Sequence, residues 1–285
     1  MTFFDTSIDR KSDVVDGTLD LFEGIPLPSV VEISESGTCN RVCSFCPRSA
    51  PDFPDIKKFI EPDLIERLSS QLGVTGYRGI FLFSGFVEPL LDKNIFSLVS
   101  IVRRNLPNAR IEMVTNGDVL NKDRLTQLYD SGLSTLLISV YDGPEDVEKF
   151  SQMCAHLQPN QYVIRPRYLP PEQDFGITLS NRGGMMEGAA FPIKTPMAPL
   201  KVSCYYPHYT FFMDYLGDVL LCPHDWAKHL VVGNMKDQDF MQIWTSSAFS
   251  DARKNLAAAN RNFSPCKGCD VRGTLMGQAH VEAWK

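Results

Sequence analysis

Three cysteines, Cys39, Cys43 and Cys46, follow a strand-like run at residues 29–33 and constrain the fold more than any other feature of the chain. Three thiolates can hold three irons of a 4Fe-4S cube and leave the fourth iron open, whereas ferredoxin-type electron carriers use four cysteines for each cluster. This loop therefore predicts a cluster with a free coordination position. The fold has to place the loop where chemistry can occur.

The order of the apolar runs predicts an α/β fold. From Val30 onward, strand-like runs alternate with amphipathic stretches, which is typical of β-α units around a parallel sheet. The predicted strands cover residues 30–34, 79–84, 110–115, 135–140, 162–168 and 176–180, and the predicted helices cover 62–72, 93–106, 122–131 and 144–157. We expect a partial (β/α)6 TIM-like barrel with the cysteine loop at the carboxyl end of its first strand, where binding loops project.

This pattern changes after Asn181, where glycines and prolines mark a connection. A predicted hairpin at 209–215 and 219–222 follows, and then two predicted helices at 240–244 and 250–258. We place a domain boundary near residue 195. The chain is thereby divided into an N-terminal extension (1–29), a barrel (30–195) and a small C-terminal domain (196–285).

Four further cysteines form a second pattern in the C-terminal part. Cys204 and Cys222 are separated by seventeen residues, and Cys266 and Cys269 by two. The first two lie on or beside the predicted hairpin and the others on a short knuckle, which suits a tetrahedral metal or a fully ligated 4Fe-4S cube. Zinc ribbons use the same thiolates and the same spacing, so this pattern by itself leaves zinc and iron-sulfur open.

The composition narrows the partners and the compartment. The net charge is −6 and no basic stripe is present, which argues against a nucleic-acid partner. The first residues lack the apolar segment of a secretory signal, and no run of 18 apolar residues could span a membrane. We expect a cytoplasmic protein with a small-molecule or peptide substrate. Cys154, on a predicted helix, is interpreted as a buried core residue rather than as a hydrogen donor to a substrate radical.

The first cysteine pattern, with the aromatic Phe45 before its last cysteine, resembles the motif of radical S-adenosylmethionine (radical SAM) enzymes. The C-terminal cysteines resemble the twitch domain, a short relative of the SPASM auxiliary-cluster domain, and both similarities together cover residues 30 to 270. The resemblance implies two 4Fe-4S clusters, S-adenosyl-L-methionine (SAM) as cofactor, and a reducing partner such as flavodoxin or ferredoxin.

Other positions resemble the SAM-binding residues of the family. The stretch Ser-Gly-Phe-Val-Glu-Pro after the second predicted strand is similar to a glycine-rich motif whose glutamate holds the SAM amino group, which implies roles for Gly85 and Glu88. Val87 departs from the motif, because glycine is usual there and a β-branched residue does not easily take a positive φ. At the ends of the third and fourth predicted strands, Asn116 and Ser139 are implied to contact the ribose and methionine parts of SAM.

Three arginines are candidates for the substrate site. Arg165 and Arg167 alternate along the fifth predicted strand, so both point to one face. If that face is the barrel lumen, they could hold the SAM carboxylate or an anionic or hydroxylated substrate, and on the outer face they would only be solvated. Arg182 lies in an Asn-Arg-Gly-Gly stretch that resembles the connection between barrel and extension in members with one auxiliary cluster.

The resemblance also implies a reaction. In these enzymes, reductive cleavage of SAM gives methionine and a 5'-deoxyadenosyl radical that takes hydrogen from a carbon. A closed second cluster could accept an electron from an alcohol-derived radical, which would give a ketone. The cysteine layout is similar to that of an aminocyclitol dehydrogenase of this family, so the leading hypothesis is a dehydrogenase for a hydroxyl of a sugar, cyclitol or similar small metabolite. The alternatives are a peptide-modifying radical SAM enzyme that epimerises or crosslinks, and a non-enzymatic zinc or electron-carrier protein.

Overall fold

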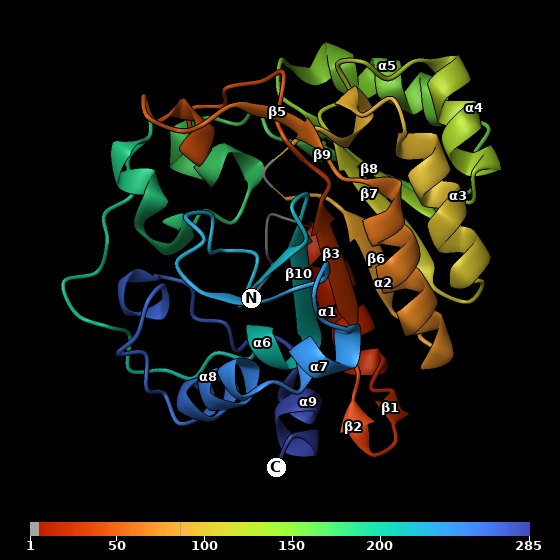
Figure 1. Cartoon of the computed structure of the whole chain (residues 1–285). Coiled ribbons are helices and arrows are strands. Elements are labelled where there is room, and N and C mark those ends of the chain that lie inside the picture. Colours follow the sequence, from red (N-terminus) through yellow and green to blue (C-terminus); the bar gives the residue numbers. More distant parts are fainter. Residues whose placement is uncertain (1–5, 86) are drawn as a thin grey trace.

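An eight-stranded sheet forms the centre of the computed structural model, which describes residues 6–85 and 87–285 (Figure 1). Its strand order is β12-β11-β10-β3-β6-β7-β8-β9, and the six strands from β10 to β9 run parallel. The strands are β3 (Val30–Ser34), β6 (Ile80–Phe83), β7 (Arg110–Thr115), β8 (Thr135–Val140), β9 (Tyr162–Pro166), β10 (Thr210–Asp214), β11 (Asp218–Leu220) and β12 (Val231–Asn234). The antiparallel strands β11 and β12 extend the sheet at one edge.

Helices cover one face of this sheet because its strands alternate between apolar and polar residues. Val31 and Ile33 on β3 lie in the main hydrophobic core, whereas Glu32, between them, points to the opposite face. The covering helices are α2 (Pro62–Val74), α3 (Ile95–Asn105), α4 (Lys122–Asp130), α5 (Pro144–Cys154) and α7 (Phe240–Trp244). Four helices were predicted from the amphipathic periodicity of the segments between the strands. The structure has a helix at each of these four places.

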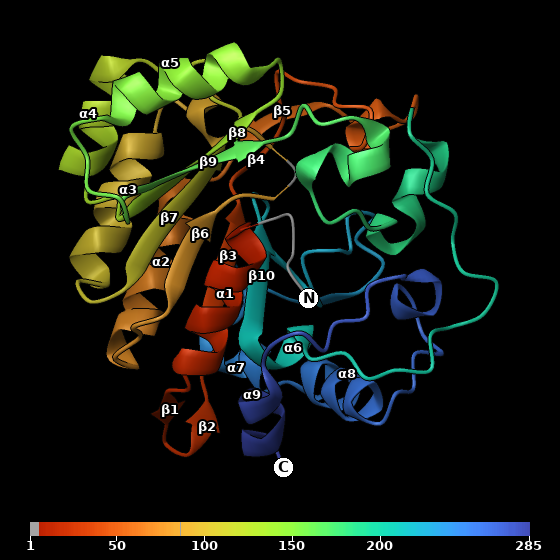
Figure 2. The same cartoon turned by 180° about the vertical axis from the view of Figure 1, so that it is seen from behind.

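The opposite face, called the inner face below, carries polar side chains. Besides Glu32, it presents Glu112 on β7, and Ser139 on β8 pairs in register with Arg165 on β9. Helix α1 (Thr6–Gly17) lies across this face, in front of β3 in Figure 2. None of the helices in the described residues is long and apolar enough to cross a bilayer.

The predicted α/β class with a mostly parallel sheet is confirmed, but one predicted strand is wrong. Residues 176–180 form no strand, because the chain there follows the 3-10 segment η3 (Pro171–Gly176). Asp174, Phe175 and Gly176 have positive φ values that are incompatible with extended backbone. The sixth parallel strand is instead β10 from the C-terminal part, which pairs with β3 on the side opposite β6.

The remaining elements are short. Two small hairpins, β1 (Leu21–Phe22) with β2 (Ile25–Pro26) and β4 (Ser36–Gly37) with β5 (Ile56–Phe59), flank the first central strand. In the C-terminal part, α6 (Tyr206–Tyr209), α8 (Ser247–Ala257) and α9 (Gln278–Ala283) pack beside the start of β10 (Figure 2). They place the second set of cysteines near the inner face.

Candidate active site with two cysteine clusters

Cys39, Cys43 and Cys46, called the trio site below, lie on the loop that leaves the carboxyl end of β3 through β4. The Cys46 N–H donates to the Cys43 carbonyl at 3.0 Å, which bends the loop back on itself. Burial and the neighbouring Cys46 and Cys39 thiols raise the pKa of Cys43 to about 12. The three thiols are therefore neighbours in space and are partly exposed.

Arg41, between the first two cysteines, ties this loop to the ends of β7 and β8. Its guanidinium donates to both oxygens of Asp118, at 2.7 and 2.5 Å, and to both oxygens of Asp142, at 2.8 and 2.5 Å. Hydrogen bonding to Asp142 and Asp118 raises the pKa of Arg41, and the same contact lowers the pKa of Asp142. Arg41 was not predicted from the sequence, because its partners are 77 and 101 residues away and only the sheet brings them close.

Glu88, after β6, is a buried carboxyl close to the trio site. It accepts from the Thr115 hydroxyl at 2.6 Å, the Asn116 N–H at 2.6 Å and the Leu90 N–H at 3.0 Å. Burial is the largest influence and raises the pKa of Glu88 to about 7, although these donors lower it. The Glu88 N–H donates to the carbonyl of Thr38, the residue before the first cysteine, at 3.2 Å.

The other predicted SAM-binding residues lie around the same loop. Asn116 donates to Asn40 Oδ1 at 2.8 Å, and its amide nitrogen lies 3.9 Å from the Cys39 sulfur. Gly85 has a φ of 98°, and a Cβ there would lie 2.8 Å from the Ser34 Cβ, so the position requires glycine. Phe86 lies outside the described residues.

A cleft of about 430 Å³ opens beside the trio site and is lined by Cys43, Phe45, Tyr141 and Arg167, among others. Phe45 packs against Phe175 with ring centroids 4.7 Å apart and stacks on Tyr141 at 6.1 Å. This aromatic wall offers a flat apolar surface next to the cysteines. A planar ring of a ligand could pack on it.

The side chains of Arg165 and Arg167 both lie on the inner side of the sheet. Arg165 donates to the Ser139 hydroxyl at 2.7 Å, and Arg167 lines the cleft and donates to the Gly176 carbonyl. Burial raises the pKa of Tyr141, and both guanidinium groups oppose this shift. The structure therefore brings these two arginines together with Ser139 and Tyr141 near the trio site.

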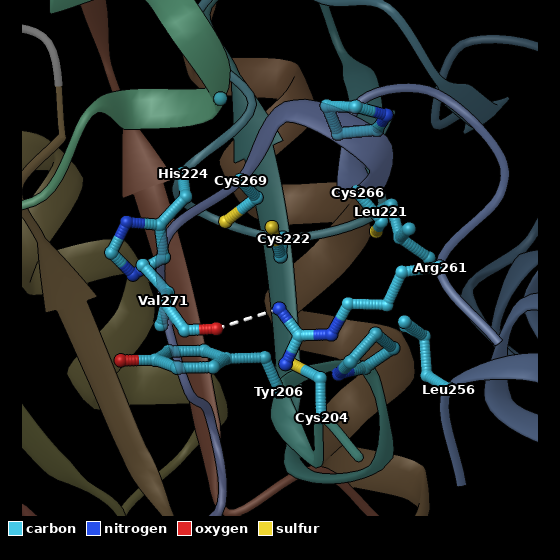
Figure 3. A pocket seen from close by; sticks show the side chains of 13 residues that line it. Cys204, Tyr206, Leu221, Cys222, His224, Leu256, Arg261, Cys266, Cys269 and Val271 are labelled. Atoms are coloured by element: carbon cyan, nitrogen blue, oxygen red, sulfur yellow. Dashed lines mark hydrogen bonds between the residues drawn. The ribbon is translucent and has the colours of Figure 1, made fainter. Parts of the chain in front are cut away.

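The other four cysteines, called the quartet site below, surround one cavity (Figure 3). Cys204 precedes α6 and Cys222 follows β11. Cys266 is the first residue of the single turn η5 (Cys266–Gly268), and Cys269 follows it. Burial and the other three cysteines raise the pKa of Cys222 well above its usual range. The cavity walls also include Tyr206 and His224.

Arg261, which the sequence analysis did not single out, holds the quartet site together. It is 2 % exposed although it carries a charge. Its guanidinium donates to the carbonyls of Val202 at 2.9 Å, Ser203 at 2.9 Å, Val271 at 2.6 Å and Arg272 at 2.8 Å, of which the Val271 bond is drawn in Figure 3. The segments on either side of the cavity are joined through this one side chain.

A second set of hydrogen bonds connects the quartet site to Asn181, which lies in the predicted barrel region. The Asn181 N–H lies 3.0 Å from both carboxylate oxygens of Asp270, and its side-chain amide donates to the Gly268 carbonyl at 2.6 Å. Because Asn181 is buried, these bonds are shielded from water. They fix the Cys266–Cys269 knuckle against the segment that carries Arg182.

Arg182 lies between the trio and quartet sites. Its φ of 48° is uncommon for a residue with a side chain, and Gly183 follows with a φ of 63°. The Arg182 guanidinium lies 3.3 Å from His224 Nδ1 and 5.5 Å from the centroid of the Trp226 ring. Its positive charge opposes the burial that raises the pKa of Cys46, and adds to the burial that lowers the pKa of His224. This arginine therefore acts on groups at both cysteine sites.

The thiol sets suit iron-sulfur cubes. In the part of the chain that the structure describes, no three or more Cys, His, Asp or Glu side chains are arranged to hold a single metal ion. The quartet site offers four thiols around one cavity, and the trio site offers three thiols beside a cleft. Cys154 is fully buried in the helix-side core, as predicted, and is away from both sets.

Comparison with protein families gives two matches on this chain. The radical SAM superfamily model matches residues 33–156, and the model of the SPASM iron-sulfur cluster-binding domain matches residues 204–270. The first range contains the trio site and Glu88, and the second contains all four cysteines of the quartet site. The two matches therefore fall on the two regions that the cysteine patterns indicate.

Individual relatives agree with these matches. The S-adenosyl-L-methionine-dependent 2-deoxy-scyllo-inosamine dehydrogenase of Niallia circulans is 30% identical over 245 residues, which is 85% of this chain and 92% of the relative. The crystal structure of BtrN in complex with AdoMet and 2-DOIA is similar with a TM-score of 0.74 and 28% identity, covering 89% of this chain and 97% of that one. The GTP 3',8-cyclase of Aquifex aeolicus is 28% identical over 49% of this chain and 44% of its own.

Proposed function

Because this chain belongs to the radical SAM superfamily, in which it is an oxidoreductase, we propose that it oxidises one hydroxyl of a sugar, a cyclitol or a similar small polyol to a ketone. The observation that carries this proposal is the pair of cysteine sites with Arg182 between them. One site opens to a cleft and the other encloses its cavity. The similarity to a 2-deoxy-scyllo-inosamine dehydrogenase, which covers 85% of this chain, supports the substrate class.

The cofactors are SAM and two 4Fe-4S clusters. When bound, they supply a hydrogen-abstracting radical at the trio site and a one-electron acceptor at the quartet site. We assign Cys39, Cys43 and Cys46 to the first cluster. The second cluster is assigned to Cys204, Cys222, Cys266 and Cys269.

The chain's own residues would orient SAM. We assign Glu88 to the amino group, because its carboxylate is fixed by three donors and lies beside the trio site. Gly85 lets the backbone pass close to Ser34, and Asn116 and Ser139 offer polar groups at the ends of β7 and β8. Phe45 provides an apolar wall for the adenine.

In this proposal, one arginine binds the cofactor and two arginines bind the substrate. Arg165, held by Ser139, is assigned to the SAM carboxylate. Arg167 and Arg182 are assigned to hydroxyl groups of the substrate, since they lie at the cleft and between the cysteine sites. Donors from both sides would hold the reacting carbon in one orientation.

The proposed roles follow the domain boundaries that were predicted from the sequence. We assign SAM binding to residues 30–195 and the second cluster to residues 196–285, with residues 1–29 as an extension. A reducing partner such as flavodoxin or ferredoxin would supply the electron that SAM cleavage requires. We infer a cytoplasmic setting, because thiols that serve as cluster ligands need reducing surroundings. The negative net charge favours small molecules over nucleic acids.

One experiment tests the function directly. The protein is loaded with iron and sulfide under anaerobic conditions and incubated with SAM, dithionite and a panel of neutral, acidic and amino polyols. We expect 5'-deoxyadenosine together with an equal amount of a product that has lost two hydrogens. If SAM is cleaved but no polyol loses hydrogen, the dehydrogenase function is wrong. A peptide panel in the same assay then tests epimerisation and crosslinking.

A further inference from the structure

Asn116 comes directly after β7, and its side chain belongs to a ring of three hydrogen bonds. Its amide nitrogen donates to Asn40 Oδ1 at 2.8 Å, and the amide nitrogen of Asn40 donates to Asp118 Oδ2 at 2.7 Å. The Asp118 N–H then donates to Asn116 Oδ1 at 2.9 Å, which closes the ring. Rotation of any of these three side chains would break at least one of the bonds.

Neighbouring groups fix this ring to the rest of the site. The Arg41 guanidinium donates to both carboxylate oxygens of Asp118, at 2.7 and 2.5 Å. The Asn116 N–H donates to Glu88 Oε2 at 2.6 Å, and Asn116 is 8 % exposed. The Asn116 side chain therefore has a defined position between Glu88, which is assigned to SAM, and the loop that carries the trio site.

The amide nitrogen of Asn116 also lies 3.9 Å from the sulfur of Cys39, the residue before Asn40. The Arg41 N–H donates to the same sulfur at 3.4 Å. A side-chain amide has two hydrogens on its nitrogen, and Asn40 Oδ1 accepts one of them. The second hydrogen is thus available to the Cys39 sulfur, so two N–H groups face this one cluster ligand.

Hydrogen bonds to the ligand sulfurs change the reduction potential of an iron-sulfur cluster. Reduction adds one negative charge, part of which lies on the thiolates, and an N–H donor stabilises the thiolate more strongly as this charge grows. Because Asn116 is buried, water does not screen its contact with the sulfur. The Asn116 amide therefore favours the reduced cluster, which is the state that SAM cleavage requires.

We propose that Asn116 is a positioning residue for the trio site, which donates a hydrogen bond to the Cys39 thiolate and raises the reduction potential of the cluster there. The ring with Asn40 and Asp118 keeps this donor aimed at the sulfur. The inference rests on the proposed assignment of a 4Fe-4S cluster to the trio site, and it gives the Asn116 side chain a role that does not depend on contact with SAM. The electron that reduces the cluster comes from the reducing partner of the proposed function.

The test measures the reduction potential without SAM or substrate. The anaerobic holoenzyme is titrated potentiometrically with dithionite and followed by EPR spectroscopy, and the reduction step that is missing in Cys43→Ala is that of the trio cluster. Asn116→Leu has a similar size but no donor. At a fixed potential, its ratio of reduced to oxidised trio cluster should fall about tenfold, which is about 59 mV for one electron. Asn40→Ala opens the ring but keeps the Asn116 amide, so it should lower the potential by less.

Asn121→Leu is the matched control, because Asn121 is exposed and its side chain accepts from the Arg124 N–H at 2.9 Å, at the start of α4. It should lower the thermal unfolding temperature and leave the potential unchanged. Asn40 is also exposed, so Asn40→Ala tests the proposal even where Asn116→Leu lowers the iron content. The proposal is overturned if the variants that keep about eight irons have the trio potential of the wild type, even where their SAM affinity falls. Failure to oxidise a polyol is a separate result, because this measurement needs no substrate.

Discussion

The trio and quartet sites use the same ligand atom but are built in opposite ways. The trio site is a loop beside a cleft, and it is tied to the sheet by ion pairs of Arg41 with partly exposed aspartates. The quartet site encloses its cavity, and it is tied by a buried arginine that donates to four backbone carbonyls. The three thiols of the trio site lie beside an open cleft, and the four thiols of the quartet site surround an enclosed cavity.

This difference separates two chemical tasks. A site that binds a small molecule needs a free coordination position, an entrance and groups that orient the ligand, and the trio site has the cleft and Glu88. A site that only exchanges electrons needs neither, and enclosure keeps water away from it. We therefore predict that a substitution at the trio site and a substitution at the quartet site impair different steps.

The largest expected effect comes from removing one cysteine at each site. Cys43→Ala should abolish SAM cleavage, because only two thiols are left for the SAM-binding cluster. Cys222→Ala should still cleave SAM but form no ketone. Iron counting should fall from about eight to about four per chain in either variant. Detection of 5'-deoxyadenosine and ketone by mass spectrometry separates them, and SAM cleavage by Cys43→Ala would contradict the division of tasks.

A smaller effect is expected from Arg261→Met, which removes the buried guanidinium and leaves its carbonyl partners without donors. The free energy of unfolding should fall by about 3 kcal/mol, and iron should be lost from the quartet site only. Urea unfolding and iron counting under anaerobic conditions measure both. Arg104→Met is the control, since Arg104 forms an exposed ion pair with Glu66. Equal losses in the two variants would show that Arg261 has no special role.

The pH dependence tests the trio site through Glu88, whose pKa is about 7 in the fold. Below pH 7 the carboxyl is neutral and cannot pair with an ammonium, so SAM affinity should fall by about tenfold per pH unit. Glu88→Gln should bind SAM weakly with little pH dependence.

The same residue affects stability. The pKa of Glu88 is near its ordinary value of 4.5 in the unfolded chain and about 7 in the fold, so its contribution to stability falls as pH rises through this window. The Glu88→Gln protein should lack that decrease. SAM titrations and urea unfolding between these pH values check both expectations, and a wild-type SAM affinity that is flat across pH 5 to 8 would exclude Glu88 as the amine ligand.

The smallest effect is expected for Arg41→Gln. Its ion pairs are partly exposed, so the free energy of unfolding should change by about 1 kcal/mol or less. SAM should bind a few-fold more weakly because the loop loses its anchor. Arg41→Lys should not restore binding, since an ammonium cannot form two bidentate contacts at once. Full rescue by lysine, measured by the same titration, would mean that charge alone positions the loop.

The sequence was sufficient where the determinants are local. The trio, the quartet pattern and the helices after each central strand follow from spacing and periodicity, and they lie where they were predicted. Gly85 and Glu88 were predicted as SAM-binding residues through the resemblance of a short motif. In all these cases, the neighbours in sequence decide the local structure.

The features that were not predicted from the sequence depend on contacts between residues that are far apart in the chain. Arg41 and Arg261 act through residues that only the folded sheet or the C-terminal loops bring near, and neither spacing nor composition indicates such pairs. The strand predicted at 176–180 has alternating apolar residues, Ile177 and Leu179, but positive φ values just before it redirect the chain. The pairing of β10 with β3 was missed because periodicity identifies a strand without its neighbour.

That pairing fixes where the two cysteine sites lie relative to each other. Residues Val30–Ser34 of β3 and Thr210–Asp214 of β10 are hydrogen-bonded in register, and the chain leads from these strands to Cys39 and Cys222. If the quartet site accepts an electron from the substrate, as proposed, the distance that the electron crosses depends on this ladder. A one-residue slip would move one strand by about 3.3 Å and turn its side chains to the other face. The register of two strands therefore sets the spacing of the two cysteine sites, and an insertion in either strand would change it without touching a cysteine.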